Sequence, residues 1–367
     1  MKKQFLLVLV LMLISGINYP VTYAQVLDQT GFETYADETE YTITSWRADG
    51  FTVPWVNGFN QSRAFVDDAF ARSGTKSLRI TYPANTFGPT DGGAQAPLMV
   101  TPANELYMSY WVRFSDNFDW GGTSEGGKLP GLGGGGRCSG CTVCTGSNGF
   151  TARLMWRPGG KAVLYLYHME ADKANGPCGD NDALQLTTGT DFYFQKGQWY
   201  NIIQRVKVNT ATSHDGEVQL WINGQQALLR TGIQFVSNGD KVDNLYFSTF
   251  HGGSTSVWAP SVDCYTWFDD IKIAATWADV AQDGITTDIK NSAAEKFAVY
   301  PNPSSQDFTV SAHAGSFTVS LYNAAGQLLS VNTYNAATHI GEGLPAGIYV
   351  IRIEQNGIAE SKKVIKQ

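Results

Sequence analysis

The stretch "TARLMWRPGGKAVLYLYHM", residues 151–169, decides the fold class, because two alternating runs flank a tight turn. Side chains of a β-strand point alternately to its two faces, so Arg153 and Arg157 share one face of the first run. Tyr165 and Tyr167 share one face of the second run in the same way. The connecting "PGGK" is short enough for a hairpin, which predicts that the two pairs are cross-strand neighbours on one outer surface.

Similar runs, rich in β-branched and aromatic residues, recur along the chain between clusters of Gly, Asn, Asp and Pro. They occupy residues 107–114, 150–156, 162–169, 199–208, 217–222, 244–250 and 265–273. Asn223 and Gly224 directly follow one of these runs, and this dipeptide is typical of a type I′ hairpin turn. Many short strands without intervening helices predict an all-β fold, a two-sheet β-jelly-roll sandwich.

The N-terminal sequence has the order of a secretory signal peptide: MKKQ is positively charged, FLLVLVLMLI is apolar, and a small residue follows at Ala24. We expect cleavage after Ala24. The apolar block is too short to span a bilayer, and no other stretch approaches that length, which predicts a soluble mature protein without a membrane span. The predicted organisation is a signal peptide (1–24), a β-jelly-roll domain (25–275), a linker (276–294) and a second unit (295–367).

Three stretches characterise the second unit: "FAVYPNPS" (297–304), "VSLYNAAGQLL" (319–329) and "GLPAGIYVIRIEQNGIAESKKVIKQ" (343–367). Alternating strands and turns predict a small immunoglobulin-like β-sandwich. The three stretches closely resemble the C-terminal sorting domain of the type IX secretion system. The resemblance implies that the type IX secretion machinery is a partner and that the protein is secreted or attached to the cell surface. The alternative interpretation is a plain immunoglobulin-like spacer.

The charge is unevenly distributed along the chain. The formal net charge of −7 argues against nucleic acid as a partner, because a polyanion would be repelled at long range. Between residues 113 and 161, however, the sequence contains six basic residues and only three acidic ones. The basic residues are Arg113, Lys128, Arg137, Arg153, Arg157 and Lys161, and the acidic residues are Asp116, Asp119 and Glu125. This basic segment suggests an anionic ligand, and a solvated loop with scattered charges is the alternative.

The chain has five cysteines: Cys138, Cys141, Cys144, Cys178 and Cys264. Disulfides are the default in an exported protein, so one cysteine must be left over, and the sequence does not say which pairs form. The C-x2-C-x2-C run could instead bind a metal. We disfavour that interpretation, because no fourth ligand follows at a familiar spacing and the compartment is oxidising.

Cations and phenols on one surface suit elimination across a uronic acid residue. The C5 proton of a uronate becomes acidic enough to remove only when its carboxylate is neutralised by Arg or Lys. A base then takes that proton and an acid protonates the departing O4 oxygen; tyrosine can serve in either role, and neighbouring cations lower a phenol's pKa. Glycoside hydrolysis instead needs two facing carboxylates, and no E-x-D-x-E-like strand is present.

Seven segments resemble polysaccharide lyase family 14, in order over roughly residues 105–273. They are "YWVRFSDNFDW", "GGKLPGL", "FTARLMWR", "YLY", "KGQWYNIIQRVKVNT", "DGEVQLWING" and "FSTFHGG". The family includes alginate lyases and β-1,4-glucuronan lyases on a β-jelly roll. The resemblance implies that Lys128 and Arg153 neutralise the uronate carboxylate and that Tyr165 and Tyr167 act as base, acid or both. Which tyrosine takes which role stays open, and the reaction needs no metal or other cofactor.

Three more residues are predicted to bind substrate. Thr151 replaces the serine that the family usually has, and it keeps a hydroxyl donor and acceptor. Arg157 shares a strand face with Arg153, although it could merely form a salt bridge with a loop. His251 stands where the family often has an aromatic residue, although most histidines are packed or on the surface. Lys128 lies in a Gly-rich segment that reads as a loop, where the alternative is a merely solvated lysine.

We therefore predict a secreted polysaccharide lyase that cleaves a 1,4-linked uronic acid polysaccharide by β-elimination and leaves a 4,5-unsaturated uronate. Alginate is the first candidate substrate and glucuronan the second. We expect a monomer whose partner is this anionic polysaccharide. The alternatives are a non-catalytic, lectin-like glycan-binding module and a glycoside hydrolase.

Overall fold

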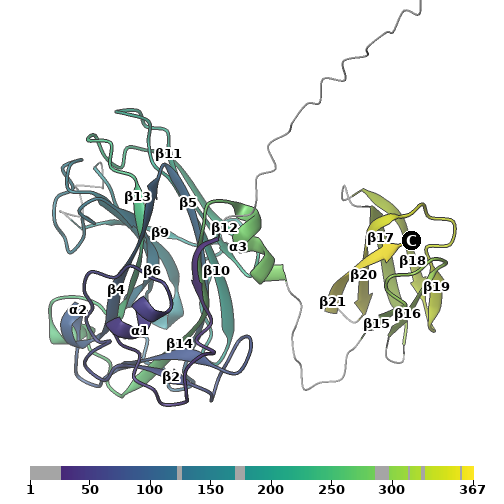
Figure 1. Ribbon diagram of the computed structural model, residues 1–367, viewed down its shortest axis with the longest axis horizontal. Coiled ribbons are helices and arrows are strands. Elements are labelled where there is room, and N and C mark those ends of the chain that lie inside the picture. Colours follow the sequence, from purple (N-terminus) through teal and green to yellow (C-terminus); the bar gives the residue numbers. More distant parts are fainter. Residues whose placement is uncertain are drawn as a thin grey trace, which may run out of the picture. The chain divides into compact units, whose positions relative to one another are not determined.

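Two antiparallel β-sheets pack face to face in the computed structural model and form the core of the first of two compact units (Figure 1). The first unit ends at Thr286 and the second begins at Thr287. The structure describes residues 26–121, 126–169, 178–285, 297–312, 315–323, 327–355 and 358–367. The predicted signal peptide lies outside the described residues. Among the described residues, no helix is long and apolar enough to cross a membrane.

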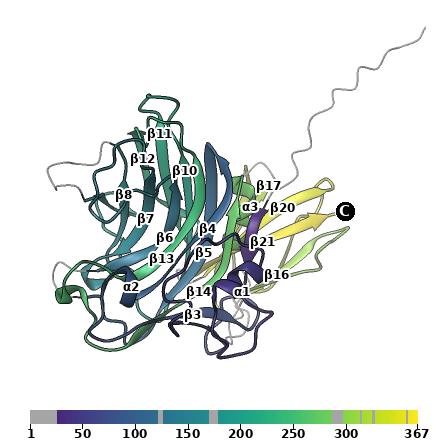
Figure 2. The same cartoon turned by 60° about the vertical axis from the view of Figure 1, so that its left-hand side comes forward.

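The two sheets contain eight and six strands (Figure 2). The order in the larger sheet is β12 (Gln225–Ile233), β11 (Gly216–Ile222), β10 (Trp199–Lys207), β5 (Glu105–Phe114), β14 (Cys264–Ala274), β3 (Ser77–Tyr82) and β2 (Ala64–Asp67), and β1 (Val26–Thr30) pairs with β14. The order in the smaller sheet is β4 (Gly93–Ala103), β13 (Val242–His251), β6 (Gly127–Gly134), β7 (Phe150–Trp156), β8 (Ala162–Tyr167) and β9 (Asp180–Ala183).

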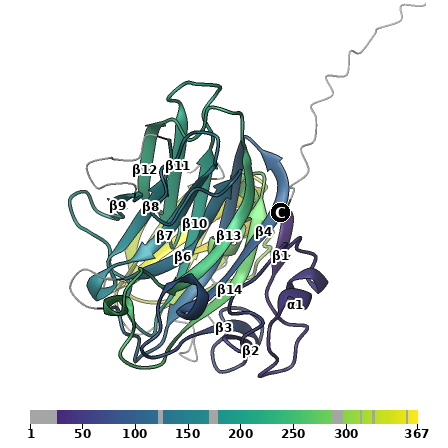
Figure 3. The same cartoon turned by 90° about the vertical axis from the view of Figure 1, so that its left-hand side faces the viewer.

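Strand alternation explains why the two sheets stack. On β7, Leu154 and Trp156 point into the space between the sheets, and on β8, Leu164 and Leu166 do the same; all four are fully buried. Complete burial of one such side chain contributes about 1.5–3 kcal/mol. Figure 3 shows β6, β7 and β13 of the smaller sheet side by side. The predicted all-β, two-sheet sandwich is confirmed.

The predicted hairpin turn joins β11 to β12. Asn223 and Gly224 have φ angles of 51° and 78°, the positive values that a type I′ turn requires at both central positions. The short runs read from the sequence also match the strands closely; β7, for example, spans the predicted residues 150–156. Local sequence therefore determines this part of the fold.

The segment that contains Lys128 is a strand and not the loop expected from its glycines. This strand, β6, lies between β13 and β7 in the middle of the smaller sheet. A Cβ on Gly131 would lie 2.1 Å from the carbonyl oxygen of Ala152, and one on Gly127 would lie 2.0 Å from the ring of Trp156. The glycines therefore permit close approach of neighbouring strands and rings, a role that turn statistics do not capture.

Helix α3 (Trp277–Ile285) occupies part of the predicted linker, residues 276–294. Its Trp277 ring packs against the ring of Trp221, with centroids 4.4 Å apart, and its Val280 is fully buried. These contacts place α3 on the outer face of the eight-stranded sheet. The part of the linker beyond the helix lies outside the described residues.

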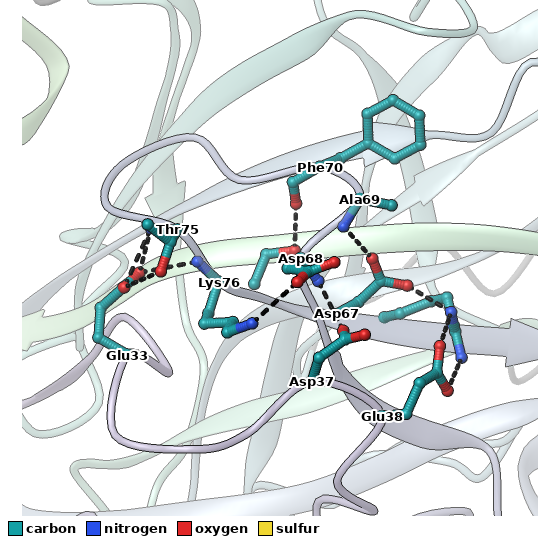
Figure 4. Close-up of polar contacts among 11 residues, drawn as sticks. Glu33, Asp37, Glu38, Asp67, Asp68, Ala69, Phe70, Thr75 and Lys76 are labelled. Atoms are coloured by element: carbon teal, nitrogen blue, oxygen red, sulfur yellow. Dashed lines mark hydrogen bonds and ion pairs between the residues drawn. The ribbon is translucent and has the colours of Figure 1, made fainter.

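Polar contacts tie the N-terminal segment to the β2–β3 edge of the larger sheet (Figure 4). The Glu33 carboxylate accepts hydrogen bonds from the backbone N–H groups of Thr75 and Lys76, each at 3.0 Å. The Lys76 ammonium pairs with Asp68 at 3.2 Å, and the backbone N–H of Asp68 donates to Asp37 at 3.0 Å. Exposed pairs of this kind contribute about 0–1 kcal/mol each, so they position the segment more than they stabilise it. Two short helices complete this unit, α1 (Ile43–Ala48) and α2 (Gly88–Asp91).

The second unit has two small sheets around its own core. One contains β15 (Phe297–Tyr300), β16 (Phe308–Ala312) and β19 (Thr338–Ile340); the other contains β18 (Leu328–Tyr334), β17 (Phe317–Asn323), β20 (Gly347–Gln355) and β21 (Ile358–Lys366). Its buried residues include Phe297, Phe308, Val310, Phe317, Ile351 and Ile353. The predicted small β-sandwich is confirmed.

Candidate active site

The β7–β8 hairpin brings the predicted arginine and tyrosines together. In its antiparallel register, Arg153 lies opposite Tyr165, and Thr151 lies opposite Tyr167. The turn is a 3₁₀ helix, Pro158–Gly160. Because the alternate residues of both strands fill the core, these four side chains lie on the outer face of the six-stranded sheet. The predicted cross-strand contact is confirmed for Arg153 and Tyr165, whereas Tyr167 lies opposite Thr151 and Arg157 follows the last paired residue of β7.

The neighbouring strand β6 adds Lys128 to the same face. Lys128 lies opposite Met155 of β7, and its ammonium nitrogen is 3.1 Å from the Met155 Sδ. The same nitrogen lies 4.4 Å from the centroid of the Tyr165 ring, and the side chain is only 8% exposed. A thioether is a weak acceptor and an aromatic face attracts a cation only modestly. Lys128 is therefore a buried cation held by two weak contacts.

The two phenols form a hydrogen-bonded pair. The oxygens of Tyr165 and Tyr167 are 2.8 Å apart, and their rings meet edge to face with centroids 5.0 Å apart. The backbone N–H of Cys141 donates to the Tyr167 oxygen at 2.7 Å. This donor occupies one lone pair of the Tyr167 oxygen. Two oxygens at this distance can exchange a proton directly.

Arg153 lies between the phenols and strand β13. Its Nη1 donates to the Ser248 hydroxyl at 3.1 Å, and its guanidinium carbon lies 5.3 Å from the centroid of the Tyr246 ring. Its Nε–H is buried without a hydrogen-bond partner among the described residues. A buried, unpaired donor on a cation is costly unless a ligand accepts it. The guanidinium is therefore prepared for an anionic group.

The cations of this face lack acidic partners. Within the described ranges, no ion pair links Lys128, Arg153 or Arg157 to a carboxylate. Elsewhere in the same unit, Arg205 pairs with Glu105 at 2.8 Å. Three neighbouring positive charges without a counter-charge produce a positive potential that attracts anions.

Burial and mutual repulsion alter the acidity of this face. Burial, followed by the charges of Arg153 and Arg157, holds the pKa of Lys128 well below its usual range. Burial, followed by the hydrogen bond with Tyr167, raises the pKa of Tyr165, although Arg153 and Arg157 oppose that shift. The two arginines do act to lower the pKa of Tyr165, as expected, but the net shift is upward because desolvation is the larger effect.

Two disulfides organise the loop beside this face. Cys138 pairs with Cys144, and Cys141 pairs with Cys178 across a sequence separation of 37 residues. Cys264 is the leftover cysteine and is buried. The sulfurs of Cys138 and Cys144 belong to one apolar cluster with the two phenol rings. The C-x2-C-x2-C run thus forms disulfides, and the loop that it stabilises packs on the candidate site.

Thr151 supports this loop in place of the predicted contact with substrate. The side chain is fully buried, and its hydroxyl donates to the carbonyl oxygen of Cys138 at 3.0 Å. No part of the hydroxyl is left accessible to a ligand. The interpretation of Thr151 as a substrate-binding residue is therefore corrected to that of a residue that holds the loop.

His251 lies in the core, so its predicted contact with substrate is wrong. The side chain is fully buried, and its ring lies 5.2–5.6 Å from the rings of Trp156, Tyr82 and Phe118, measured between centroids. Alternation along β13 explains the error. The preceding residue, Phe250, is opposite Lys128 on the outer side, so His251 must point inward.

Arg157 extends the cationic face beyond Lys128. It is half-buried, and its Nη2 donates to the side-chain oxygen of Asn181 on β9. Its guanidinium carbon lies 6.0 Å from the centroid of the Tyr165 ring. The structure therefore brings Lys128, Arg153, Tyr165, Tyr167 and Arg157 onto one surface and separates Thr151 and His251 from it.

Five residues near the site were not predicted. Ser248 and Tyr246 hold Arg153, and Gln95 on β4 accepts a hydrogen bond from the Tyr246 hydroxyl at 2.8 Å. The Asn181 side chain accepts a hydrogen bond from Arg157, and the backbone N–H of Cys141 donates to Tyr167. The alternation of "NLYFSTF" could have revealed Tyr246 and Ser248, because both face the same side as the outward residue Phe250. A backbone donor such as that of Cys141 has no residue signature.

This arrangement combines two chemical capabilities. Unpaired buried cations can stabilise negative charge that develops on a bound carboxylate. A hydrogen-bonded phenol pair can take up one proton and supply another. The combination suits proton abstraction beside a carboxylate.

Comparisons with known proteins identify the family of each unit. Residues 71–271 match the family described as polysaccharide lyase 14, and residues 298–367 match the secretion system C-terminal sorting domain. No curated protein sequence matches the chain significantly.

Solved structures resemble the first unit. The alginate lyase Aly36B, as a mutant in complex with an alginate tetrasaccharide, is 27% identical with a TM-score of 0.58, over 69% of this chain and 98% of that chain. The same lyase without a described ligand is 28% identical with a TM-score of 0.56 over the same shares of the two chains. A family-14 alginate lyase from Aplysia kurodai, 23% identical with a TM-score of 0.55 over 69% of this chain and 100% of that chain, shares the fold.

The sorting domain directs export by type IX secretion, so the protein is secreted or held at the cell surface. The family match spans more than half of the chain and includes every strand of the candidate site. The chain therefore belongs to polysaccharide lyase family 14 and is a polysaccharide lyase with a C-terminal sorting domain.

Proposed function

We propose that this lyase cleaves a 1,4-linked uronic acid polysaccharide by β-elimination, with alginate as its first substrate and glucuronan as its second. The observation that carries the proposal is the group of three unpaired cations, Lys128, Arg153 and Arg157, around the hydrogen-bonded phenols of Tyr165 and Tyr167. A polyuronate offers the repeated carboxylates that such a surface attracts. The alginate tetrasaccharide bound to the similar lyase Aly36B supports alginate as the first candidate.

In the proposed reaction, Arg153 and Lys128 bind the carboxylate of the sugar that contributes C4 to the cleaved bond and becomes the unsaturated uronate. Their charges stabilise the negative charge that appears on this carboxylate when the C5 proton leaves. The C5–H and C4–O4 bonds break, and a C4–C5 double bond forms. One proton passes to a protein base, and one proton is delivered to the O4 oxygen of the departing chain.

We assign the acid and base roles from the surroundings of the two phenols. The raised pKa of Tyr165 keeps its proton in place near neutral pH, which suits it to protonate O4. Tyr167 receives the backbone N–H of Cys141 and lies within hydrogen-bond distance of Tyr165, so two donors can stabilise negative charge on its oxygen. Tyr167 is therefore the proposed base.

The test is to incubate the secreted protein with alginate, glucuronan and pectate and to follow the ultraviolet absorbance of the new C4–C5 double bond. We expect this absorbance to rise fastest with alginate. New reducing ends without the absorbance would indicate a hydrolase, and binding without either signal would indicate a lectin-like module. A faster rise with glucuronan would reverse the order of the two substrates.

A further inference from the structure

A pocket of about 260 Å³ adjoins the catalytic face at the end of the β7–β8 hairpin. It is lined by Arg157, Pro158, Lys161, Val163, Asn181 and Ala183. Val163 belongs to the same outward row of β8 as Tyr165 and Tyr167. Arg157 follows Arg153 by four residues, which is about 13 Å along an extended strand. The backbone positions of Arg153 and Arg157 are therefore farther apart than the width of one sugar ring.

The charge of the pocket comes from Arg157. Its guanidinium contacts the side-chain oxygen of Asn181, whose own amide nitrogen donates to the carbonyl oxygen of Gly179 at 3.2 Å. Asn181 is thus fixed at both ends and holds Arg157 in place. Burial lowers the pKa of Arg157, and no ion pair with a carboxylate is present in the described part of the chain to compensate it.

The second cation of the pocket is already neutralised. The Lys161 ammonium pairs with Asp191 at 2.5 Å, and Asp191 also accepts a hydrogen bond from Gln185 at 3.1 Å. The pocket therefore presents one uncompensated positive charge in a space that suits a single sugar unit. Such a site fits one carboxylate.

We propose that this pocket is a distal subsite that binds the carboxylate of a second uronate residue on the same polysaccharide chain. The proposal rests on the proposed function, because it places the bond to be cleaved beside Tyr165 and Tyr167. A chain long enough to fill both places gains a charge-assisted hydrogen bond to Arg157. The subsite therefore makes the enzyme favour longer substrates and determines the shortest chain that is cleaved efficiently.

A different role for Arg157 leads to a different result. Its guanidinium carbon is 6.0 Å from the centroid of the Tyr165 ring, so it could act only by adjusting the acidity of that phenol. In that case its removal would slow the cleavage of short and long chains equally. A subsite contributes only when the chain reaches it, so length dependence separates the two roles.

The experiment measures kcat/KM on purified oligouronates of increasing length and on the polymer, for the wild type and three variants. We expect the loss of kcat/KM caused by Arg157→Gln to be about tenfold or more greater on long chains than on the shortest chain that is cleaved, the equivalent of one charged hydrogen bond. Asn181→Asp places a carboxylate beside Arg157 within the protein, and we expect the same length-dependent loss.

The matched control is Lys207→Gln on β10 of the other sheet. It removes one positive charge from a side chain that pairs with Glu217 at 3.5 Å, and we expect the length dependence of the wild type. An equal loss by Arg157→Gln at all lengths, or no loss at any length, would overturn the subsite. Failure of the wild type to cleave any uronan would instead refute the proposed function, so the two failures are distinguishable.

Discussion

The phenolic oxygens of Tyr165 and Tyr167 lie 2.8 Å apart on the outer face of the six-stranded sheet. We expect Tyr165→Phe and Tyr167→Phe each to lower kcat by about 10²–10⁴-fold, because each change removes a group that transfers a proton in the proposed reaction. Affinity for the polymer should change little, because the cations remain. Turnover is measured from the ultraviolet absorbance of the product, and affinity by calorimetry.

The matched control for these variants is Tyr107→Phe, which removes a phenol that donates to Glu105 on the other sheet. Its activity should equal that of the wild type. Full activity in both site variants would remove the phenols from the mechanism.

Arg153 should affect both binding and turnover, because in the proposed reaction its charge acts on the carboxylate before and during proton removal. We expect Arg153→Ala to lower kcat/KM by about 100-fold or more. Arg153→Lys should recover only part of the loss, since one ammonium cannot reproduce the fork of donors that a guanidinium presents. The control Lys76→Ala removes a charge from the β3 edge and should have no effect. A wild-type KM in Arg153→Ala would contradict the role in binding.

The buried His251 should make the protein sensitive to acid. Burial lowers the pKa of His251 from 6.5 to about 4. Between these two pH values, His251 is therefore neutral in the folded protein and protonated in the unfolded chain. The stability that depends on neutral His251 is complete above pH 6.5 and is lost as pH falls from 6.5 to about 4. The loss amounts to about 3 kcal/mol.

His251→Phe keeps an aromatic ring beside Trp156 and Phe118 and removes the titrating group. We expect its thermal midpoint to fall less than that of the wild type between pH 7 and pH 4.5, as measured by calorimetry at both values. An identical fall in both proteins would show that His251 does not contribute to acid sensitivity.

The disulfide between Cys141 and Cys178 should support turnover as well as stability. Closure of its 37-residue loop is worth about 4 kcal/mol by loop entropy. The variant Cys141→Ser with Cys178→Ser should also lower kcat, because the backbone N–H that donates to the Tyr167 oxygen is then less firmly held. Activity and melting temperature are measured on the wild type and on this double variant under oxidising conditions.

The comparison for this variant is Cys138→Ser with Cys144→Ser, which opens a loop with a sequence separation of only 6. It should lose less stability. The Cys141–Cys178 bond would have only a structural role if the variant that lacks it melted at a lower temperature but kept the kcat of the wild type.

The sequence predicted the hairpin that carries the site, because Arg153 and Tyr165 alternate with core residues on two strands joined by a short turn. It did not predict β6, because the glycines beside Lys128 read as turn formers, whereas in the structure they admit the Trp156 ring and neighbouring backbone. The error at His251 has a related cause. In a short apolar strand, the sequence does not show which alternate residues point into the core. An assignment shifted by one residue along β13 therefore places every side chain on the wrong face.

Some contacts have no signal in any residue type. The donor to Tyr167 is the main chain of Cys141, placed there by two disulfides whose pairing the sequence left open. Asn181 reaches Arg157 from an edge strand that belongs to no recognisable motif. Motifs therefore predicted the candidate residues, and the structure shows which groups contact them.

The buried, uncompensated charges of Lys128 and Arg153 lower the stability of the substrate-free enzyme, and binding of the proposed anionic polymer would compensate them. The variant Lys128→Met should therefore melt at a higher temperature than the wild type and cleave poorly. Substrate should raise the melting temperature of the wild type more than that of this variant. The site therefore lowers the stability of the free protein, and binding of the proposed acidic polymer would restore it.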